Sequence, residues 1–221
     1  MRAAIFDIDG TLLDSVDLHA RAWVEAFAHF GVETDFAEVR SQIGKGGDEL
    51  MPVFLPKARI EREGEAIEAY RSDLFKRKYL PDVRPFPGVR ALFERIRASG
   101  SKIALASSGK RSEVDHYTEI LKIGDLVDVS TSSDDADRSK PHPDIFAAAV
   151  KKLAGTPTKA ILVIGDTPYD AEAAAKAGLR TIGVLCGGFP EADLSAAGCV
   201  AIYRDPQDLL DGFEHSPLAR A

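Results

Sequence analysis

Four short apolar runs, spaced along the chain, constrain the fold of this 221-residue sequence more than any other feature. They cover residues 3–6, 102–106, 160–164 and 181–185. Nearly continuous apolar runs of this length are typical of strands that are covered on both faces. Strands that alternate with helices form a parallel sheet with right-handed crossovers. The sequence therefore predicts an α/β fold.

Glycine and proline mark the helices that connect these strands. Apolar residues at 89, 92, 93 and 96 share one helical face, and Gly100 follows as a C-cap. A second helix is expected to begin after Pro143. A third, alanine-rich helix is expected over residues 170–177, ending at Gly178.

The segment from about residue 16 to residue 80 interrupts this alternation. Its pattern is helical throughout, with charged faces and no apolar strand, and it ends in the proline-rich LPDVRPFPG. We therefore expect a helical insertion, with linkers near residues 13–15 and 81–87. The predicted core domain comprises residues 1–14 and 82–221, and the predicted inserted domain comprises residues 15–81. The polar run STSSDDADRSK at 130–140 is expected to be a loop.

Composition narrows the class of protein. The hydrophobic content of 45% allows a sizeable core, and the net charge of −7 disfavours binding to nucleic acid or to an anionic membrane. No apolar run approaches the ~18 residues of a membrane-spanning helix. Cys186 and Cys199 are the only cysteines, which are too few for a disulfide framework. These features predict a cytoplasmic protein.

Polar residues whose side chains can take part in catalysis or ligand binding follow the apolar runs. They are Asp7 and Asp9 after the first run, Ser107 and Ser108 after the second, Lys140 in SKPHPD, and Asp166 and Asp170 in GDTPYD. Each alone has an ordinary explanation as a turn residue, a solvated lysine or a helix N-cap. Ligands of open parallel sheets bind outside the carboxyl ends of the strands, so these side chains are expected to meet at one edge.

Several carboxylates at one point repel each other unless a cation lies among them. Oxygen ligands from carboxylates, backbone carbonyls and water suit Mg²⁺. We therefore interpret the Asp7 and Asp9 pair as part of a metal and phosphate site. One carboxylate is then free to bind the metal and attack, while the other transfers protons.

The motifs DxDGTLxDS, the strand-end serine, SKPxPDIF and GDTxxD occur here in one order, and together they resemble the haloacid dehalogenase-like superfamily of phosphotransferases. The resemblance covers essentially the whole chain. It implies a Rossmann-like parallel sheet core with an inserted four-helix cap. It also places the chain near the phosphoglycolate phosphatase and β-phosphoglucomutase group.

The resemblance implies a role for each motif residue. Asp7 is the expected nucleophile, forming an aspartyl-phosphate, and Asp9 is the expected general acid and then base. Lys140 supplies a fixed positive charge near the phosphoryl group.

The same resemblance implies a Mg²⁺ site and a phosphate-binding loop. Mg²⁺ is expected to be held by Asp7, the backbone carbonyl of Asp9 and Asp166, with Asp170 as a ligand or as a residue that orients one. Ser107 and the backbone N–H groups near Ser108 and Gly109 are expected to bind the phosphoryl oxygens.

Substrate choice depends on the helical insertion. His19 and Trp23 share a helix face, which either packs in the core of the insertion or faces the active site. Lys45, in the glycine-rich SQIGKGGDEL, either reaches an anionic group of the substrate or belongs to an ordinary turn. The loop that carries an arginine in the sugar phosphomutases has none here, although His19 and the following RAW look mutase-like.

The sequence thus predicts a Mg²⁺-dependent phosphatase for a small phosphomonoester of the phosphoglycolate or sugar phosphate type. A β-phosphoglucomutase-like mutase is the alternative, and a non-enzymatic phosphoacceptor or binding module is a remote one. A haloacid dehalogenase is disfavoured because the second aspartate of DxD indicates phosphate chemistry. The expected partner is a small phosphorylated metabolite, and the expected state is a monomer or a homodimer.

Overall fold

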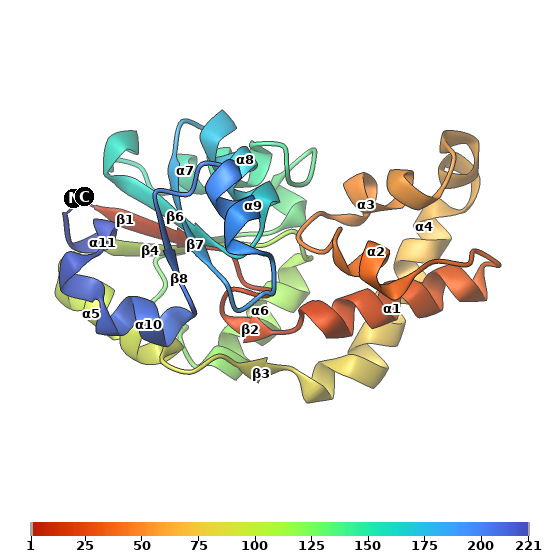
Figure 1. The fold of residues 1–221 in the computed structure, drawn as a ribbon, viewed down its shortest axis with the longest axis horizontal. Coiled ribbons are helices and arrows are strands. Elements are labelled where there is room, and N and C mark those ends of the chain that lie inside the picture. Colours follow the sequence, from red (N-terminus) through yellow and green to blue (C-terminus); the bar gives the residue numbers. More distant parts are fainter. Residues whose placement is uncertain (1, 221) are drawn as a thin grey trace.

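Strand β1 (Ala3–Phe6) lies inside a six-stranded sheet in the computed structural model, which describes residues 2–220 (Figure 1). The strand order is β5-β4-β1-β6-β7-β8, and every neighbouring pair is parallel. The other strands are β4 (Lys102–Ala106), β5 (Val129–Thr131), β6 (Ile161–Gly165), β7 (Arg180–Val184) and β8 (Ala201–Tyr203). The predicted α/β class is confirmed.

The two edge strands are the part of the sheet that the apolar runs did not indicate. β5 and β8 have three residues each, and most of these residues are only half-buried. β5, with the sequence VST, lacks the continuous apolar run of a central strand, whereas β8, with the sequence AIY, is apolar but short. The expectation of a loop over residues 130–140 was therefore wrong at its start, where β5 ends and a 3₁₀ turn, Ser133–Asp135, follows.

Helices cover both faces of the sheet because alternate strand residues point to opposite sides. Phe6 packs with α5, α6, α10 and α11 on one face, and Ile5 packs with α7 and α8 on the other (Figure 1). These helices and α9 are α5 (Val89–Ala98), α6 (Arg111–Leu121), α7 (Asp144–Lys152), α8 (Pro168–Lys176), α9 (Glu191–Ala196), α10 (Pro206–Asp211) and α11 (Pro217–Arg220). Within residues 2–220, the helices all fall short of the length and apolar character needed to cross a membrane.

A separate group of helices lies beside the sheet, at the right of Figure 1. It comprises α1 (Val16–His29), α2 (Phe36–Arg40), α3 (Gly47–Phe54) and α4 (Lys57–Leu74), followed by a π-helical turn (Phe75–Tyr79) and a 3₁₀ turn (Leu80–Asp82). These helices bury a cluster of their own, which includes Trp23, Phe27, Leu50 and Ile67. The named elements between residues 16 and 82 are thus all helices, joined by loops, which agrees with the helical pattern predicted for about residues 16–80.

A two-stranded antiparallel ribbon forms where the chain enters and leaves this helical group. β2 (Leu13–Asp14) pairs with β3 (Arg84–Pro85), so both predicted linkers contain one of its strands. Of the predicted domain limits, residues 1 and 221 lie outside the described residues.

The glycine-rich stretch is only partly a loop. Gly44 has a φ of 108°, and a Cβ atom there would lie 2.7 Å from Thr167 Cγ2, so this position requires glycine. Gly47, in contrast, is the first residue of α3. A Cβ atom on Gly47 would lie 1.9 Å from Glu68 Oε2, so a larger residue there would require the Glu68 carboxylate to move.

We predict that Phe93→Ala lowers the free energy of unfolding by about 3–5 kcal/mol, because the substitution leaves a cavity in the core. The Phe93 ring is fully buried, with its centroid 4.7 Å from that of Phe6. Phe36→Ala is the matched control, since Phe36 is 37% exposed and should cost no more than about 0.5 kcal/mol. Urea denaturation measures both, and equal losses would contradict this description of the core.

Candidate active site

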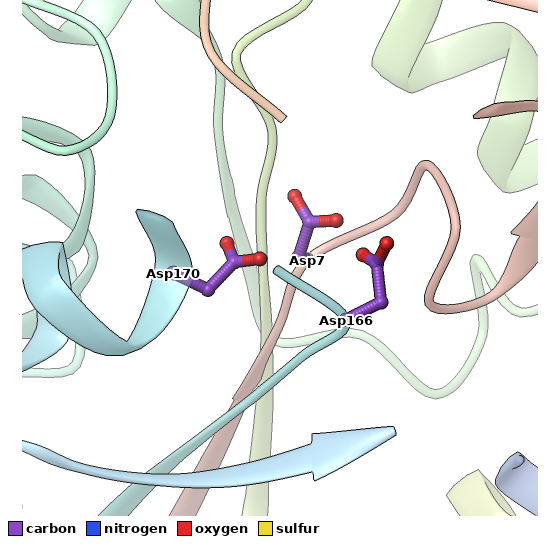
Figure 2. Close-up of side chains that lie close together, drawn as sticks. All are labelled: Asp7, Asp166 and Asp170. Atoms are coloured by element: carbon purple, nitrogen blue, oxygen red, sulfur yellow. The ribbon is translucent and has the colours of Figure 1, made fainter. Parts of the chain in front are cut away.

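Three buried aspartates converge at the carboxyl edge of the sheet. Asp7 directly follows β1, Asp166 directly follows the neighbouring strand β6, and Asp170 lies in the first turn of α8. Figure 2 shows their carboxylates grouped together, and one oxygen of each lies within 4.8 Å of the others. The Asp7 N–H donates to the Ile164 carbonyl at 2.9 Å, which fixes the start of this loop against β6. Parallel pairing of β1 and β6 thus brings Asp7 and Asp166 together.

Lys140 places one ammonium group among these carboxylates. Its side chain is 1% exposed, and its Nζ contacts Asp7 Oδ1 and lies 2.7 Å from Asp170 Oδ1. The two carboxylates hold the pKa of Lys140 above its usual value, against the opposing effect of burial. Lys140 is therefore a permanently charged group at the site.

One ammonium does not balance three buried carboxylates. Burial raises the pKa of Asp7 to about 7, with Lys140 opposing this rise and Asp170 adding to it. Burial also raises the pKa of Asp166 well above its usual value, and the charges of Asp7 and Asp170 act in the same direction. The site has a deficit of positive charge.

One of the two carboxylate oxygens of Asp166 has no hydrogen-bond partner among the described residues. Its Oδ1 accepts a hydrogen bond of 2.9 Å from Thr11 Oγ1, but its Oδ2 is buried without a partner among the described residues. Burial of an unpaired carboxylate oxygen is costly, so a ligand is expected there. An all-oxygen donor set with excess negative charge fits a hard divalent cation such as Mg²⁺.

Asp170 has contacts on both of its carboxylate oxygens, as does Asp7, whose Oδ2 accepts a hydrogen bond of 3.3 Å from Thr11 Oγ1. The Asp170 Oδ2 accepts from the N–H of Thr167 at 3.1 Å and from Thr167 Oγ1 at 2.7 Å, and the Asp170 Oδ1 pairs with Lys140. The Asp170 N–H donates to Thr167 Oγ1, which completes a capping box at the start of α8. These contacts hold Asp170 in place next to Lys140.

Asp9 is held by a second group of side chains. Its Oδ1 accepts from Ser15 Oγ at 2.6 Å and lies 2.9 Å from His19 Nε2. Burial alone would raise the pKa of Asp9, but His19 and Ser15 outweigh it and lower that pKa. His19 also stacks on Phe75, with ring centroids 3.9 Å apart, and its Nε2 lies 3.2 Å from Tyr117 OH. His19 therefore both packs within the helical group and reaches the site.

A cavity of about 70 Å³, here called the Asp7 cavity, opens onto this cluster. Its lining includes Asp7, Asp9, His19, Trp23, the loop of residues 43–47, Ser108 and Gly109. Ser107 is 1% exposed, and its Oγ accepts a hydrogen bond of 3.0 Å from the Gly109 N–H. The predicted phosphate-binding loop thus borders the same space as Asp7 and Asp9.

Lys45 also lines the Asp7 cavity, but its ammonium has partners within the protein. Its Nζ donates to Gln42 Oε1 at 2.5 Å and lies 4.6 Å from the centroid of the Tyr169 ring. Burial lowers the pKa of Lys45, and Glu49 and Glu172 oppose this effect.

Sequence reasoning left five polar side chains of this region without a role. Thr11 and Ser15 belong to the motif DxDGTLxDS. Their hydroxyl groups, close in sequence to two aspartates, were the feature from which hydrogen bonds to carboxylates could have been predicted. Glu68 and Arg71 are three residues apart on α4, a pattern that also fits a solvated charged face, and Glu113 lies on α6. All three of these charged residues line the Asp7 cavity.

Comparisons with known proteins identify the family of this chain. A family model described as haloacid dehalogenase-like hydrolase matches residues 4–184. The chain is 33% identical over 192 residues to a phosphoglycolate phosphatase of Yersinia pseudotuberculosis, covering 85% of this chain and 82% of that protein. It is 28% identical over 212 residues to a phosphorylated carbohydrates phosphatase of Thermotoga maritima, covering 96% and 97%.

A solved structure supports the same assignment. The crystal structure of a hydrolase from Pseudomonas syringae superimposes with a TM-score of 0.87 and 29% sequence identity, covering 97% of this chain and 99% of that one. The family expected from the motifs is confirmed, and the chain belongs to the haloacid dehalogenase-like hydrolases.

Proposed function

We propose that this hydrolase is a Mg²⁺-dependent phosphatase that cleaves a small phosphomonoester through an aspartyl-phosphate at Asp7. The observation that carries the proposal is the convergence of Asp7, Asp166 and Lys140 beside Asp9. A cavity borders this cluster, and residues of both the helical group and the sheet-containing part of the chain line it. The similarity to proteins named as phosphatases of phosphoglycolate and of phosphorylated carbohydrates supports it.

Mg²⁺ would be held by a carboxylate oxygen of Asp7, the backbone carbonyl of Asp9 and the unpaired Oδ2 of Asp166. When bound, it supplies the positive charge that allows an anionic carboxylate to approach an anionic phosphate. Asp170 positions Lys140, with which its Oδ1 pairs at 2.7 Å, while Thr167 donates to its Oδ2.

In the first step, a carboxylate oxygen of Asp7 attacks phosphorus and the ester oxygen leaves with a proton from Asp9. Two contacts, from Ser15 and His19, fix the Asp9 carboxyl group in one position. A neighbouring phosphate dianion favours the protonated form of Asp9, which this step requires. Lys140 provides a fixed charge next to Asp7 without any reorganisation.

In the second step, Asp9 takes a proton from water as the water attacks the phosphorus of the aspartyl-phosphate. The pKa of Asp9, lowered by His19 and Ser15, keeps its carboxylate available once the leaving group has departed. Asp7 is released with its oxygens intact, and phosphate is the second product. Ser107, Ser108 and Gly109 are the proposed holders of the phosphoryl oxygens.

We further propose that residues 15–81 act as a cap over a core of residues 1–14 and 82–221. Two contacts join the proposed cap to the proposed core. The Ser139 N–H donates to Asp48 Oδ2 at 3.0 Å, and Arg138 Nη2 lies 3.0 Å from Glu49 Oε1. Substrate entry requires these contacts to break, and the β2–β3 ribbon is the proposed hinge.

One prediction of the proposed mechanism concerns the metal requirement and the nucleophile together. Release of p-nitrophenol from p-nitrophenyl phosphate should require Mg²⁺, stop in EDTA and return when Mg²⁺ is restored, with an unchanged circular dichroism spectrum throughout. Asp7→Asn should remain folded and lose all turnover. Full activity after exhaustive EDTA treatment would refute the metal, and substantial turnover by Asp7→Asn would refute the nucleophile.

Another prediction concerns the stability of the folded protein in EDTA as a function of pH. Asp7 has a pKa raised from 3.8 to about 7 by folding, so its contribution to stability is complete below pH 4 and is lost as the pH rises through about 7. Asp7→Asn lacks this loss. Thermal unfolding between pH 5 and pH 8.5 should therefore show the variant gaining relative to wild type as the pH rises. A difference independent of pH would contradict the raised pKa.

A further inference from the structure

A second cavity, here called the outer cavity, adjoins the Asp7 cavity and has a volume of about 400 Å³. The two cavities share Glu68, Arg71 and Glu113 as lining residues. A substituent that extends from a phosphoryl group at Asp7 into the outer cavity passes these three side chains. Pockets of about 300–1,000 Å³ enclose small organic ligands, so the outer cavity has room for more than a two-carbon substituent.

The charged side chains of the shared wall are one cation and two carboxylates, and the rest of that wall consists of Gly46, Gly47, Ser108 and Gly109. Arg71 Nη2 lies 2.6 Å from Glu68 Oε1, and its guanidinium carbon lies 5.2 Å from the centroid of the Trp23 ring. Glu113 is 7% exposed, and its Oε1 accepts a long hydrogen bond of 3.4 Å from Ser72 Oγ. Glu68 and Glu113 hold the pKa of Arg71 above its usual value despite its burial. The guanidinium charge is therefore already compensated.

This cluster is not fully satisfied by the protein. Arg71 Nε and Glu68 Oε2 are both buried without a hydrogen-bond partner among the described residues. Burying a polar atom without a partner is unfavourable, which makes the cluster a poor choice for packing alone. Its presence between the two cavities is better explained by what enters them.

We propose that Glu68, Arg71 and Glu113 select an uncharged, hydroxyl-bearing leaving group, so that the substrate is a phosphorylated sugar or other polyol. The proposal rests on the phosphatase function above and specifies its substrate class. A hydroxyl group donates to a carboxylate and accepts from a guanidinium, so it suits both kinds of partner in this wall. A second anionic group would face two carboxylates and a cation that is already paired.

The rest of the lining strengthens this preference. The charged side chains around the outer cavity are the carboxylates of Asp48, Glu65, Glu68 and Glu113 and the cations of Arg71 and Lys110. Lys45, the cation that the sequence suggested for a distal anion, has its ammonium engaged by Gln42 and the Tyr169 ring. Carboxylates therefore outnumber the cations where the leaving group would lie.

The test compares kcat/KM for three esters with Mg²⁺: glucose 6-phosphate and glycerol 3-phosphate, with uncharged hydroxyl-bearing substituents, and phosphoglycolate, with a carboxylate. p-Nitrophenyl phosphate reports on the phosphatase chemistry itself. Wild type should favour the better of the two polyol esters over phosphoglycolate by about tenfold or more, as expected for one unfavourable buried charge contact.

Glu68→Gln keeps the shape of the wall but releases Arg71 from its ion pair. It should raise the ratio of kcat/KM for phosphoglycolate over that for the polyol ester by about tenfold, and Glu113→Gln should change the ratio in the same direction. Glu61→Gln is the matched control, because Glu61 is on the same helix with a side chain 66% exposed, away from both cavities. Its ratio should equal that of wild type.

The outcomes separate the two proposals. Wild-type enzyme that does not hydrolyse p-nitrophenyl phosphate with Mg²⁺ overturns the phosphatase function and the substrate class with it. Wild-type enzyme that hydrolyses p-nitrophenyl phosphate but favours phosphoglycolate over both polyol esters overturns the substrate class alone. Folded Glu68→Gln and Glu113→Gln enzymes that both keep the wild-type ratio also overturn it.

Discussion

The structure depends on keeping several like charges together in a buried place. Asp7, Asp166 and Asp170 are almost completely buried, and the single ammonium of Lys140 lies among them. Such a cluster lowers stability unless something compensates it. Burial and this crowding of carboxylates raise the pKa values of Asp7 and Asp166, and a divalent cation is the natural compensation. The surrounding architecture can be understood as the means of holding this cluster.

Two features of the backbone hold it. Parallel pairing of β1 with β6 sets Asp7 and Asp166 side by side, and the N-terminal turn of α8 presents Asp170 to Lys140. Gly10, with a φ of 81°, allows the first loop to approach Asp166, since a Cβ atom there would lie 2.3 Å from Asp166 Oδ2. The helical group then closes the space above, and its His19 contacts Asp9 directly.

Much of this site could be predicted from the sequence because its residues follow strands that are easy to recognise. The runs at residues 3–6 and 160–164 predict strand ends at the same edge of the sheet, although not that the two strands are neighbours, and the carboxylates follow these ends. The contacts of Glu68, Arg71 and Glu113 could not be predicted in this way. They join two different helices, and charges three apart on α4 look the same in a solvated face as in a cavity wall. The short edge strand β5, with the sequence VST, lacks a continuous apolar run, whereas β8 has one, at residues 199–203, that the prediction did not use.

The central claim is that Asp7 carries the phosphoryl group, and trapping that group tests it most directly. Asp9→Asn enzyme with p-nitrophenyl phosphate and Mg²⁺ should form the intermediate, since p-nitrophenolate leaves without a proton, and should hydrolyse it slowly for lack of a base. After an acid quench, mass spectrometry of the peptides should find the phosphoryl group on Asp7. A phosphoryl group on another residue, or none during continuing turnover, would contradict the account.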